Sequence, residues 1–304
     1  MFSPEAYQLL SFGNCRKLES FGSHVVERPC PAATASATDD DAFWDSESED
    51  HNHDAGDHGY PKPDLRFEGR TGKGTWHGKA DSDWSCRYEL ATDKAIEFEL
   101  AATPTGQVGL FPEQAANWDW LAKRCTAYQK QWSRPPKLLN LFAYTGGSTL
   151  AAAAMGASVT HVDAAKSVVS WARRNAERSG IGDAPIRWIV EDAAKFVTRE
   201  LKRGNHYDGV ILDPPSYGHG PKREEWKLAR DLVELLDDCK RLLSEEPALF
   251  LLSCHTPGYG EPELSSALTT CLFGRCGAGV QTRSLDLISK DGMRLPAGHA
   301  AYWP

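Results

Sequence analysis

The sequence contains no long apolar run and no paired cysteine motif, and each absence excludes a class of protein. No stretch approaches 18 uncharged apolar residues, which argues against a membrane-spanning helix. The eight cysteines form no C-x-x-C pair and match no common zinc signature, so we expect free thiols and no metal site. The first residues also lack the basic start and apolar run of a secretory signal. We therefore expect a cytoplasmic protein with no metal cofactor and no membrane partner.

An excess of basic residues is missing as well. The chain has 34 Lys and Arg against 42 Asp and Glu, for a formal net charge of -8. Nine of the acidic residues lie between Asp39 and Asp57, a tract without Lys or Arg, and the rest of the chain is close to neutral. The net charge thus neither supports nor opposes a nucleic acid partner. Residues 31–60 contain few aliphatic side chains, which predicts a flexible acidic insert.

The length of 304 residues predicts one large domain or two ordinary ones. Between residues 65 and 108, short and partly alternating apolar runs are separated by Gly, Asp and Pro, which is typical of small antiparallel strands. We expect an N-terminal β-rich region over residues 1–108, which includes the insert, and a second domain over residues 109–304. The expected strands of the first region are Arg66–Glu68, Gly74–His77, Trp84–Tyr88 and Ala95–Leu100.

After Pro136 the pattern changes to apolar runs that alternate with segments of helical length. Strands rich in Val, Ile and Leu that alternate with helices predict a parallel sheet covered on both faces, which is a doubly wound α/β fold. Two further strands near the C-terminus predict a terminal antiparallel hairpin. The expected strands are 138–142, 158–162, 186–190, 209–212, 249–252, 279–288 and 294–303, and the expected helices are 148–155, 167–179, 193–203 and 224–243.

Polar residues and glycines follow four consecutive strands of this sheet. In such folds ligands bind beyond the carboxyl ends of the strands. The first strand is followed by Gly146 and Gly147, which let a backbone approach a ligand closely. Asp163 ends the second strand, Asp192 follows the third and Asp213 follows the fourth. A single acid there can simply cap a helix, but four such strand ends together predict a binding site.

These segments resemble class I S-adenosylmethionine-dependent methyltransferases. The resemblance rests on Asn140-Leu-Phe-Ala-Tyr-Thr-Gly-Gly147, Val162-Asp163, Glu191-Asp192 and Asp213-Pro-Pro-Ser-Tyr217. More narrowly, the chain is similar to the bacterial family of large-subunit ribosomal RNA methyltransferases that act on cytosine C5 or guanine N7. The similarity covers about residues 108–260, and includes the segment Gly109-Leu-Phe-Pro-Glu-Gln114. It implies a Rossmann-like fold and methyl transfer.

The resemblance also implies roles for individual residues. S-adenosyl-L-methionine is the implied cofactor, with Asp163 on its ribose, Asp192 on its adenine and the loop before the first helix around its methionine portion. Asp213, Pro214 and Pro215 would border the reactive methyl, with Ser216 and Tyr217 near the acceptor. The implied cofactor-binding residues are Gln114, Phe142, Tyr144, Thr145, Gly146, Gly147, Asp163, Asp192 and Asp213. Trp118 and Trp120 precede this domain and do not share a helix face, so at least one of them belongs to the core.

The reacting atom of the acceptor stays open at this point. A ring or exocyclic nitrogen needs orientation, with proton removal where it carries a hydrogen, whereas a pyrimidine C5 needs a covalent thiolate. Cys254 stands where the cytosine-C5 members carry their catalytic cysteine, and the simpler interpretation is a small buried residue. His255, which follows it, is a second candidate base. The candidate catalytic residues are Asp213, Pro214, Pro215, Ser216 and Cys254.

The acceptor molecule stays open too, with ribosomal RNA as the main hypothesis. Lys222, Arg223, Lys227 and Arg230 follow the Asp-Pro-Pro segment and can neutralise phosphates, or form an ordinary solvated face because acidic residues lie among them. A protein or small-molecule acceptor, and a cofactor-binding module without activity that serves RNA assembly, are the alternatives. A nucleotide-dependent oxidoreductase is disfavoured because the glycine fingerprint is incomplete.

Overall fold

The structure, a computed structural model, describes residues 2–34, 60–70, 73–274 and 279–304. Most of the predicted acidic insert lies outside these residues. The chain divides into two compact units, which are described separately. Unit 1 comprises Met1–Glu89, Glu97–Glu113 and Asp286–Ala297, and unit 2 comprises Leu90–Ile96, Gln114–Leu285 and Gly298–Pro304. The proposed boundary at residue 108 stays a prediction. Within the described residues, no helix is long and apolar enough to cross a bilayer.

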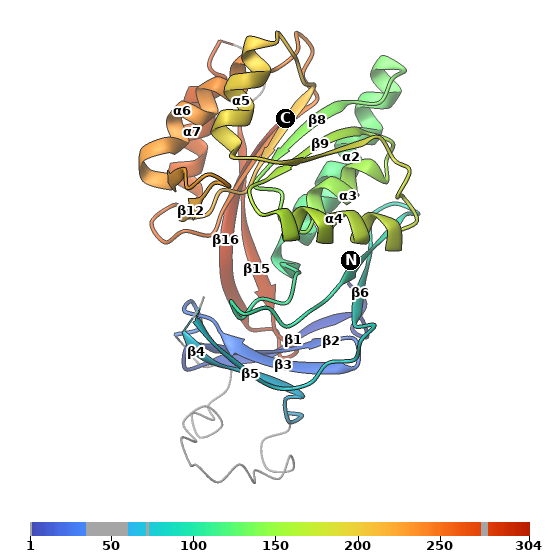
Figure 1. Cartoon of the computed structure of the whole chain (residues 1–304), viewed down its shortest axis with the longest axis vertical. Helices are drawn as coiled ribbons and strands as arrows, with labels where there is room; N and C mark the ends of the chain where they lie inside the picture. The colour runs from blue at the N-terminus through green and yellow to red at the C-terminus, as the bar shows by residue number, and fades with distance from the viewer. Residues whose placement is uncertain (1, 35–59, 71–72, 275–278) are drawn as a thin grey trace. The chain divides into compact units, whose positions relative to one another are not determined.

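Unit 1 is built on a five-stranded sheet in the order β1-β2-β3-β4-β5 (Figure 1). Neighbouring strands are antiparallel except β3 and β4, which pair in parallel. A separate two-stranded sheet pairs β6 with β7. The strands are β1 (Tyr7–Gly13), β2 (Arg16–Phe21), β3 (His24–Pro29), β4 (Leu65–Arg70), β5 (Lys73–Gly78), β6 (Ser85–Glu89) and β7 (Ala95–Glu99). A β-rich N-terminal region is thus confirmed, although its first three strands were not located from the sequence.

The first three strands carry a buried ion network that explains why an apolar pattern does not reveal them. Glu19 is fully buried, and its carboxylate accepts hydrogen bonds from Arg28 Nε at 2.7 Å and Tyr7 Oη at 3.0 Å. Lys17 Nζ lies 2.9 Å from the same group. Burial opposes ionisation of Glu19, but Arg28 and Lys17 outweigh it and lower the pKa of Glu19 to about 2. Charged residues therefore occupy positions where a strand normally shows aliphatic side chains.

Unit 2 contains a seven-stranded sheet in the order β10-β9-β8-β11-β14-β16-β15. The first five strands of this order are parallel, and β16 pairs with β14 in the antiparallel sense. The predicted doubly wound sheet with a terminal antiparallel hairpin is confirmed. Its strands are β8 (Lys137–Leu141), β9 (Ser158–Asp163), β10 (Ile186–Val190), β11 (Gly209–Leu212), β14 (Leu249–Cys254), β15 (Gln281–Ile288) and β16 (Arg294–Trp303).

Helices cover both faces of this sheet (Figure 1). One core joins Leu121 and Tyr128 of α2 (Ala115–Trp132) and Ala152 of α3 (Gly147–Ala153) to the sheet, and α4 (Lys166–Arg178) lies on the same side. The other core joins Phe196 of α5 (Ala193–Lys202) and Leu235 of α6 (Leu228–Arg241) to the opposite face. A short 3-10 helix, η1 (Pro112–Gln114), leads into α2. The layers leave the carboxyl ends of the strands as the edge where the connecting loops meet.

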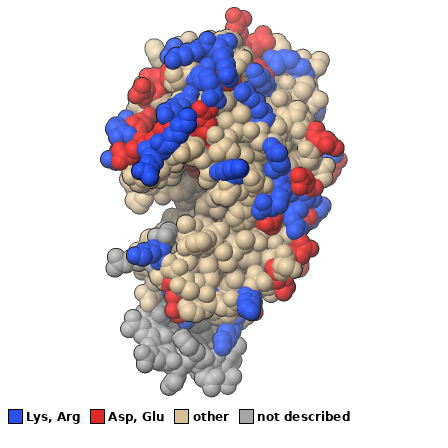
Figure 2. All heavy atoms as spheres, in the orientation of Figure 1, with Lys and Arg blue, Asp and Glu red and all other residues tan. Residues whose placement is uncertain are grey.

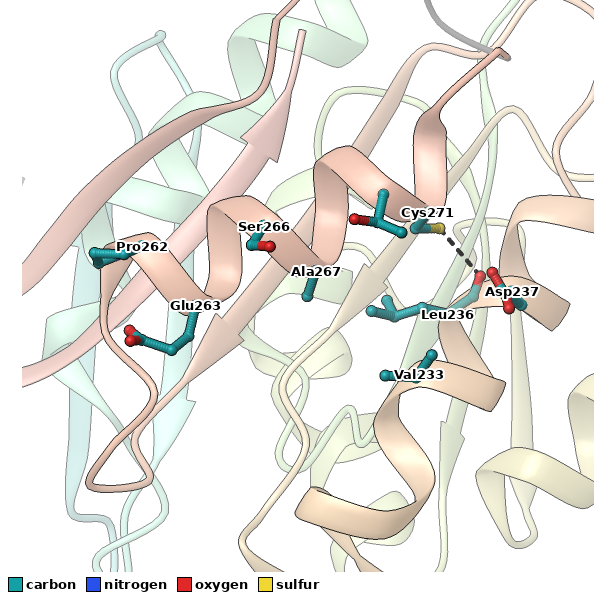
Figure 3. Close-up of a pocket in the computed structure, with 9 residues that line it drawn as sticks. Val233, Leu236, Asp237, Pro262, Glu263, Ser266, Ala267 and Cys271 are labelled. Atoms are coloured by element: carbon teal, nitrogen blue, oxygen red, sulfur yellow. Dashed lines mark hydrogen bonds between the residues drawn. The ribbon is translucent and has the colours of Figure 1, made fainter.

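Two elements of unit 2 differ from the sequence prediction. The helix expected at 224–243 begins only at Leu228, because β12 (Tyr217–His219) and β13 (Glu225–Lys227) form an antiparallel hairpin before it. The helix α7 (Glu261–Leu272) was not predicted, although a proline in its first turn and the leucines Leu264, Leu268 and Leu272 are consistent with a helix. A groove between α6 and α7 is lined by Val233, Leu236, Ala267 and Cys271, whose thiol donates to the Leu236 carbonyl at 3.3 Å (Figure 3). None of the predicted site residues lines this groove.

Candidate active site

The loop between β8 and α3 holds a strained backbone. Phe142 and Tyr144 both have positive φ angles, of 55° and 48°, and Gly146 follows with a φ of 95°. Left-handed conformations are costly for residues with a Cβ atom and often mark functional loops. Tyr144 N donates a hydrogen bond to Asp163 Oδ2 at 2.9 Å, which fixes the strained loop to the end of β9. The structure thus brings the predicted loop residues and Asp163 together.

Residue 147 has to be a glycine because another side chain of the protein lies against it. A Cβ atom at this position would lie 2.7 Å from the indole ring of Trp118, which is buried on α2. The sequence interpretation gave both glycines the same task, the close approach of a ligand. The structure separates them, since Gly146 provides the left-handed turn and Gly147 provides space for Trp118. Trp118 is also the tryptophan of the pair that belongs to the core.

Asp163 is oriented by two backbone donors at the end of β9. Its Oδ1 accepts a hydrogen bond from Ala165 N at 3.0 Å, and its Oδ2 accepts the bond from Tyr144 N. Burial raises the pKa of this carboxyl, although the backbone donors oppose the shift. Each carboxylate oxygen has further acceptor capacity, so the group retains room for hydroxyl donors such as those of a ribose.

Asp192 follows β10 and caps α5. Its Oδ1 accepts a hydrogen bond from Lys195 N at 3.0 Å, which is the ordinary role of an acid at a helix N-terminus. The turn of the β12–β13 hairpin packs beside it, because a Cβ atom on Gly220 would lie 3.0 Å from Asp192 Cβ. An ion pair between Lys195 and Glu224, at 2.5 Å, holds the same turn against α5. The capping role does not exclude a second partner for the carboxylate.

A hydrogen-bonded cluster surrounds Asp213 at the end of β11. Ser253 Oγ of β14 donates to Asp213 Oδ1 at 2.8 Å, and Gln114 Nε2 donates to Asp213 Oδ2 at 3.1 Å. His255 Nε2 lies 3.2 Å from Asp213 Oδ1. Asn117 Nδ2 donates to Gln114 Oε1 at 2.7 Å, which orients the amide. Burial alone would raise the pKa of Asp213, but the charge and hydrogen bond of His255, with Ser253 and Gln114, hold it below its usual value.

The residues after Asp213 form a rigid, partly open loop. The carbonyl of Pro215, which follows Pro214, accepts a hydrogen bond from Trp226 Nε1 at 2.8 Å. The side-chain hydroxyls of Ser216 and Thr256 lie 2.7 Å apart, which connects this loop to the one after β14. The Tyr217 side chain is half exposed. The predicted acceptor-side residues therefore lie around the ends of β11 and β14, near the Asp213 cluster.

Cys254 occupies the apolar core. Only 1% of the residue is exposed, and it packs in the core on the α5–α7 face of the sheet. Its sulfur accepts a weak hydrogen bond from Thr256 N at 3.4 Å. This environment suits a small buried thiol. The neighbouring side chains Ser253 and His255 join the Asp213 cluster.

Three residues of the cluster were not assigned to the site from the sequence. Asn117 and Ser253 are fully or almost fully buried, and such residues carry no local motif that distinguishes a site from a polar core position. His255 was weighed only as a weak base candidate. A usable signal for Ser253 and His255 was their place at the end of the fifth parallel strand, β14, where the same rule that selected Asp213 applies.

Two of the four basic residues that follow the Asp-Pro-Pro segment, Lys227 and Arg230, are paired, whereas Lys222 and Arg223 in the hairpin turn are exposed and form no ion pair within the described residues. Glu225 forms ion pairs with Lys227 at 3.1 Å and with Arg230 at 3.0 Å, and Asp231 contacts Arg230 at 2.6 Å. Figure 2 shows Lys and Arg gathered over α4 and α5 on the visible face, with Asp and Glu among them. The surface is therefore internally paired at Lys227 and Arg230 and retains positive charge at Lys222 and Arg223. Groups of three or more potential metal ligands are absent from the part of the chain that the structure describes.

Sequence comparison identifies relatives of known class. A sequence model described as S-adenosylmethionine-dependent methyltransferase matches residues 91–263. The ribosomal RNA large subunit methyltransferase K/L of Magnetococcus marinus is 30% identical over 181 residues, which cover 59% of this chain and 24% of the relative. The ribosomal RNA large subunit methyltransferase K of Neisseria meningitidis is 31% identical over 116 residues, 38% of this chain and 33% of the relative. The chain therefore spans a third or less of these relatives.

Solved structures resemble the chain over almost its whole length. A SAM-dependent methyltransferase from Agrobacterium tumefaciens is 32% identical with a TM-score of 0.81, covering 98% of this chain and 90% of that structure. A methyltransferase from Streptococcus mutans reaches a TM-score of 0.71 at 17% identity, covering 98% and 74%, which supports the fold alone.

Proposed function

The chain belongs to the S-adenosylmethionine-dependent methyltransferase family, and from this premise we propose that it methylates a nitrogen atom of a base in large-subunit ribosomal RNA. The observation that carries the proposal is the cluster at the carboxyl ends of β8, β9, β11 and β14. There a strained loop and an oriented carboxylate lie beside a second, hydrogen-bonded acid. Parallel sheets of this type bind ligands at that edge.

The cofactor of this family is S-adenosylmethionine, and the residues at the strand ends fit it. When bound, it supplies a sulfonium-activated methyl group. We propose that Asp163 accepts hydrogen bonds from the ribose hydroxyls and that Asp192 receives the adenine amino group. Residues 144–147 surround the methionine portion, with Phe142, Gln114 and Asp213 at its border. The chemistry of the donor set supports this assignment, because carboxylates at strand ends match the hydroxyl and amino donors of an adenosine.

A nitrogen acceptor agrees better with the site than a pyrimidine C5. Methylation at C5 needs a thiolate that can reach the ring, and Cys254 lies in the apolar core. A nitrogen acceptor needs orientation, and an amino nitrogen also needs a group that receives its proton. Asp213 and His255 supply polar atoms for this purpose, with Pro214, Pro215, Ser216 and Tyr217 beside them as the proposed border of the base pocket. This reasoning favours a guanine-type nitrogen over cytosine C5.

The RNA acceptor is supported by the names of the relatives. Both the Magnetococcus and the Neisseria proteins are ribosomal RNA large subunit methyltransferases, and they match this chain over 181 and 116 residues. Lys227 and Arg230 are paired with acids, which leaves Lys222 and Arg223 in the hairpin turn to neutralise phosphates. We expect the remaining RNA contacts to depend on shape and base recognition near the site.

Labelled methyl transfer tests the proposal. The protein is incubated with methyl-labelled cofactor and transcribed large-subunit ribosomal RNA, and the product nucleoside is identified by mass spectrometry. We expect a base methylated on nitrogen. A C5-methylated pyrimidine would overturn the assignment of the acceptor atom. Label in protein or in small molecules, with none in RNA, would favour the other acceptor classes. Cofactor binding without any transfer would indicate an assembly module.

A further inference from the structure

The Nε2 atom of His255 lies close to one hydrogen-bond donor and one hydrogen-bond acceptor. His255 Nε2 lies 3.1 Å from Gln114 Nε2 and 3.2 Å from Asp213 Oδ1. The Gln114 amide is oriented independently of the histidine, since its oxygen accepts from Asn117 and its nitrogen donates to Asp213 Oδ2. An N–H donor and a carboxylate acceptor therefore face the same imidazole nitrogen.

This arrangement provides a partner for each protonation state of the imidazole. In the neutral ring with its lone pair on Nε2, that nitrogen accepts a hydrogen bond from Gln114. In the imidazolium, Nε2 donates to Asp213. A group that has to gain and lose a proton during turnover needs both states to be stabilised, and a purely structural ion pair needs only one of them.

We propose that His255 is the proton acceptor of the reaction and receives the proton through Asp213. This inference rests on the proposed nitrogen acceptor and on that nitrogen carrying a hydrogen, as an exocyclic amino group does and guanine N7 does not. The acceptor nitrogen uses its lone pair to form the bond to the methyl carbon. The electron pair of the broken carbon–sulfur bond stays on sulfur. The electron pair of the N–H bond returns to nitrogen, and the proton passes over an Asp213 oxygen to His255 Nε2. Asp213 remains a carboxylate and His255 becomes an imidazolium.

The surroundings of His255 suit this role. Its side chain is 32% exposed, so the imidazolium can release the proton to water. Gly298 of β16 makes room for the ring, because a Cβ atom there would lie 2.8 Å from His255 Nδ1. Of the charged groups on the packed elements, Asp213 faces the ring from β11. The next residue of β16, His299, lies 3.9 Å from Glu261 of α7. Gln114 and Ser253 are neutral in every state.

Titration of the imidazole tests the two-partner geometry without any acceptor. The full chain is labelled with ¹⁵N in histidine rings, and the His255 signals are assigned with the His255→Gln variant. Removing the carboxylate in Asp213→Asn should lower the pKa of His255, because the imidazolium loses its partner. Removing the amide in Gln114→Leu should raise it, because the neutral ring loses its donor. A pKa that neither substitution moves overturns the proposal.

The pH profile of single-turnover methyl transfer to transcribed large-subunit ribosomal RNA tests the role in the reaction. The wild type should lose rate at low pH with a one-proton dependence centred on the pKa measured for His255. His255→Gln should lose this limb and react about 100-fold more slowly on the plateau. His206→Gln, an exposed histidine before β11, is the matched control and should keep both.

The outcomes separate this inference from the proposed function. A His255→Gln protein with the wild-type rate and the wild-type acid limb overturns the proton acceptor and leaves RNA methylation intact. Binding of S-adenosylhomocysteine, measured by calorimetry, should be unchanged in His255→Gln, which separates a chemical defect from misfolding. If the wild type binds S-adenosylhomocysteine but does not methylate the RNA, the proposed function is wrong. The titration of the imidazole then tests by itself whether Gln114 and Asp213 both act on Nε2.

Discussion

Glu19 in unit 1 and Asp213 in unit 2 are both acids whose pKa is held below its usual value, yet their surroundings differ. The Glu19 side chain is fully buried, and its partners are two cations and a tyrosine. The Asp213 side chain is 29% exposed, and its partners are an amide, a hydroxyl and an imidazole. The first arrangement fixes one charge state permanently, whereas the second lets a proton enter and leave.

The comparison shows how polar groups are used differently in the two units. In unit 1 the buried charges of neighbouring strands pair with one another. A wrong strand register would leave a buried charge without its partner, which is costly. In unit 2 two apolar cores pack against the sheet, with Asn140 and His161 as neutral polar exceptions inside it, and the polar side chains of the site gather at its carboxyl edge. The acid of unit 1 is fully buried, whereas the acid at the proposed reaction site of unit 2 is partly exposed.

The largest expected effect comes from breaking the ion network of unit 1. Glu19→Gln removes the carboxylate and leaves Arg28, with only 3% of its surface exposed, without its charge partner. An uncompensated buried charge costs about 3–5 kcal/mol, so the free energy of unfolding should fall by that amount. Urea denaturation, followed by hydrogen exchange of peptides from β1 to β3, measures it.

The matched control is Arg241→Met on the surface of α6. Its guanidinium pairs with Asp238 at 2.6 Å, one turn away on the same helix, and both side chains reach water. An exposed pair of this kind contributes roughly 0.3–0.5 kcal/mol. If Glu19→Gln were no more costly than this control, the network would have no special role in unit 1.

The next largest effect concerns binding at the edge of unit 2. Asp163→Asn keeps the shape of the side chain but removes the charge that accepts hydroxyl donors. Hydrogen bonds to charged groups contribute about 1.5–3 kcal/mol each, so we expect the affinity for S-adenosylhomocysteine to fall roughly 100-fold. Isothermal calorimetry measures it, with Asp238→Asn as a surface control. Unchanged affinity in Asp163→Asn would remove Asp163 from the proposed cofactor site.

A smaller effect tests the packing beneath the strained loop. Gly147→Ala would bring a Cβ atom to 2.7 Å from the buried indole of Trp118, and we expect a loss of about 2 kcal/mol in unfolding free energy. Gly279→Ala, where a Cβ atom meets open space, should be close to neutral. In the double variant with Trp118→Leu, the two costs should not add. Simple additivity would show that the indole is not what excludes the Cβ atom.

The parts of the fold that the sequence predicts correctly are those with an apolar signal. The five runs that became β8, β9, β10, β11 and β14 are apolar, and the first four are followed by glycines or an acid, so both the strands and the edge they share could be located. The strands β1 to β3 could not, because Lys17, Glu19 and Arg28 are buried there as an ion network. Hydropathy assigns such residues to the surface, and their pairing depends on long-range contacts.

The candidate site shows the same division. Asp163 and Asp213 follow apolar strands and were identifiable by position. The sequence identifies Gly147 as a special residue, but it does not show that glycine is needed to make room for Trp118. Only the packing of α2 brings Trp118 against Gly147. His255 gains its second neighbour from Gln114, 141 residues earlier in the chain. Spacing along the sequence carries no information about such a contact.

As the pH falls, unit 2 should lose stability before unit 1 does. His161 of β9 is fully buried, and burial lowers its pKa from about 6.5 to about 3. Its Nδ1 lies 3.0 Å from the Thr149 hydroxyl, as suits a neutral ring. Between these two pH values the unfolded chain binds a proton that the folded chain does not, so the stability of unit 2 falls as the pH drops. Glu19 contributes fully above its ordinary pKa of 4.5, and its contribution is lost only as the pH falls toward 2.

Between pH 6.5 and 4.5, then, His161 destabilises unit 2 while the network around Glu19 is still intact. We expect hydrogen exchange in β8 and β9 to accelerate in this range by the equivalent of about 1–2 kcal/mol at pH 5, with β1 to β3 unaffected until lower pH. His161→Asn lacks the titrating ring and should flatten the response of β9 above pH 4.5. If β1 to β3 lost protection first, the ion network around Glu19 would be more sensitive to acid than the buried His161. The proposed difference between the two units would then be wrong.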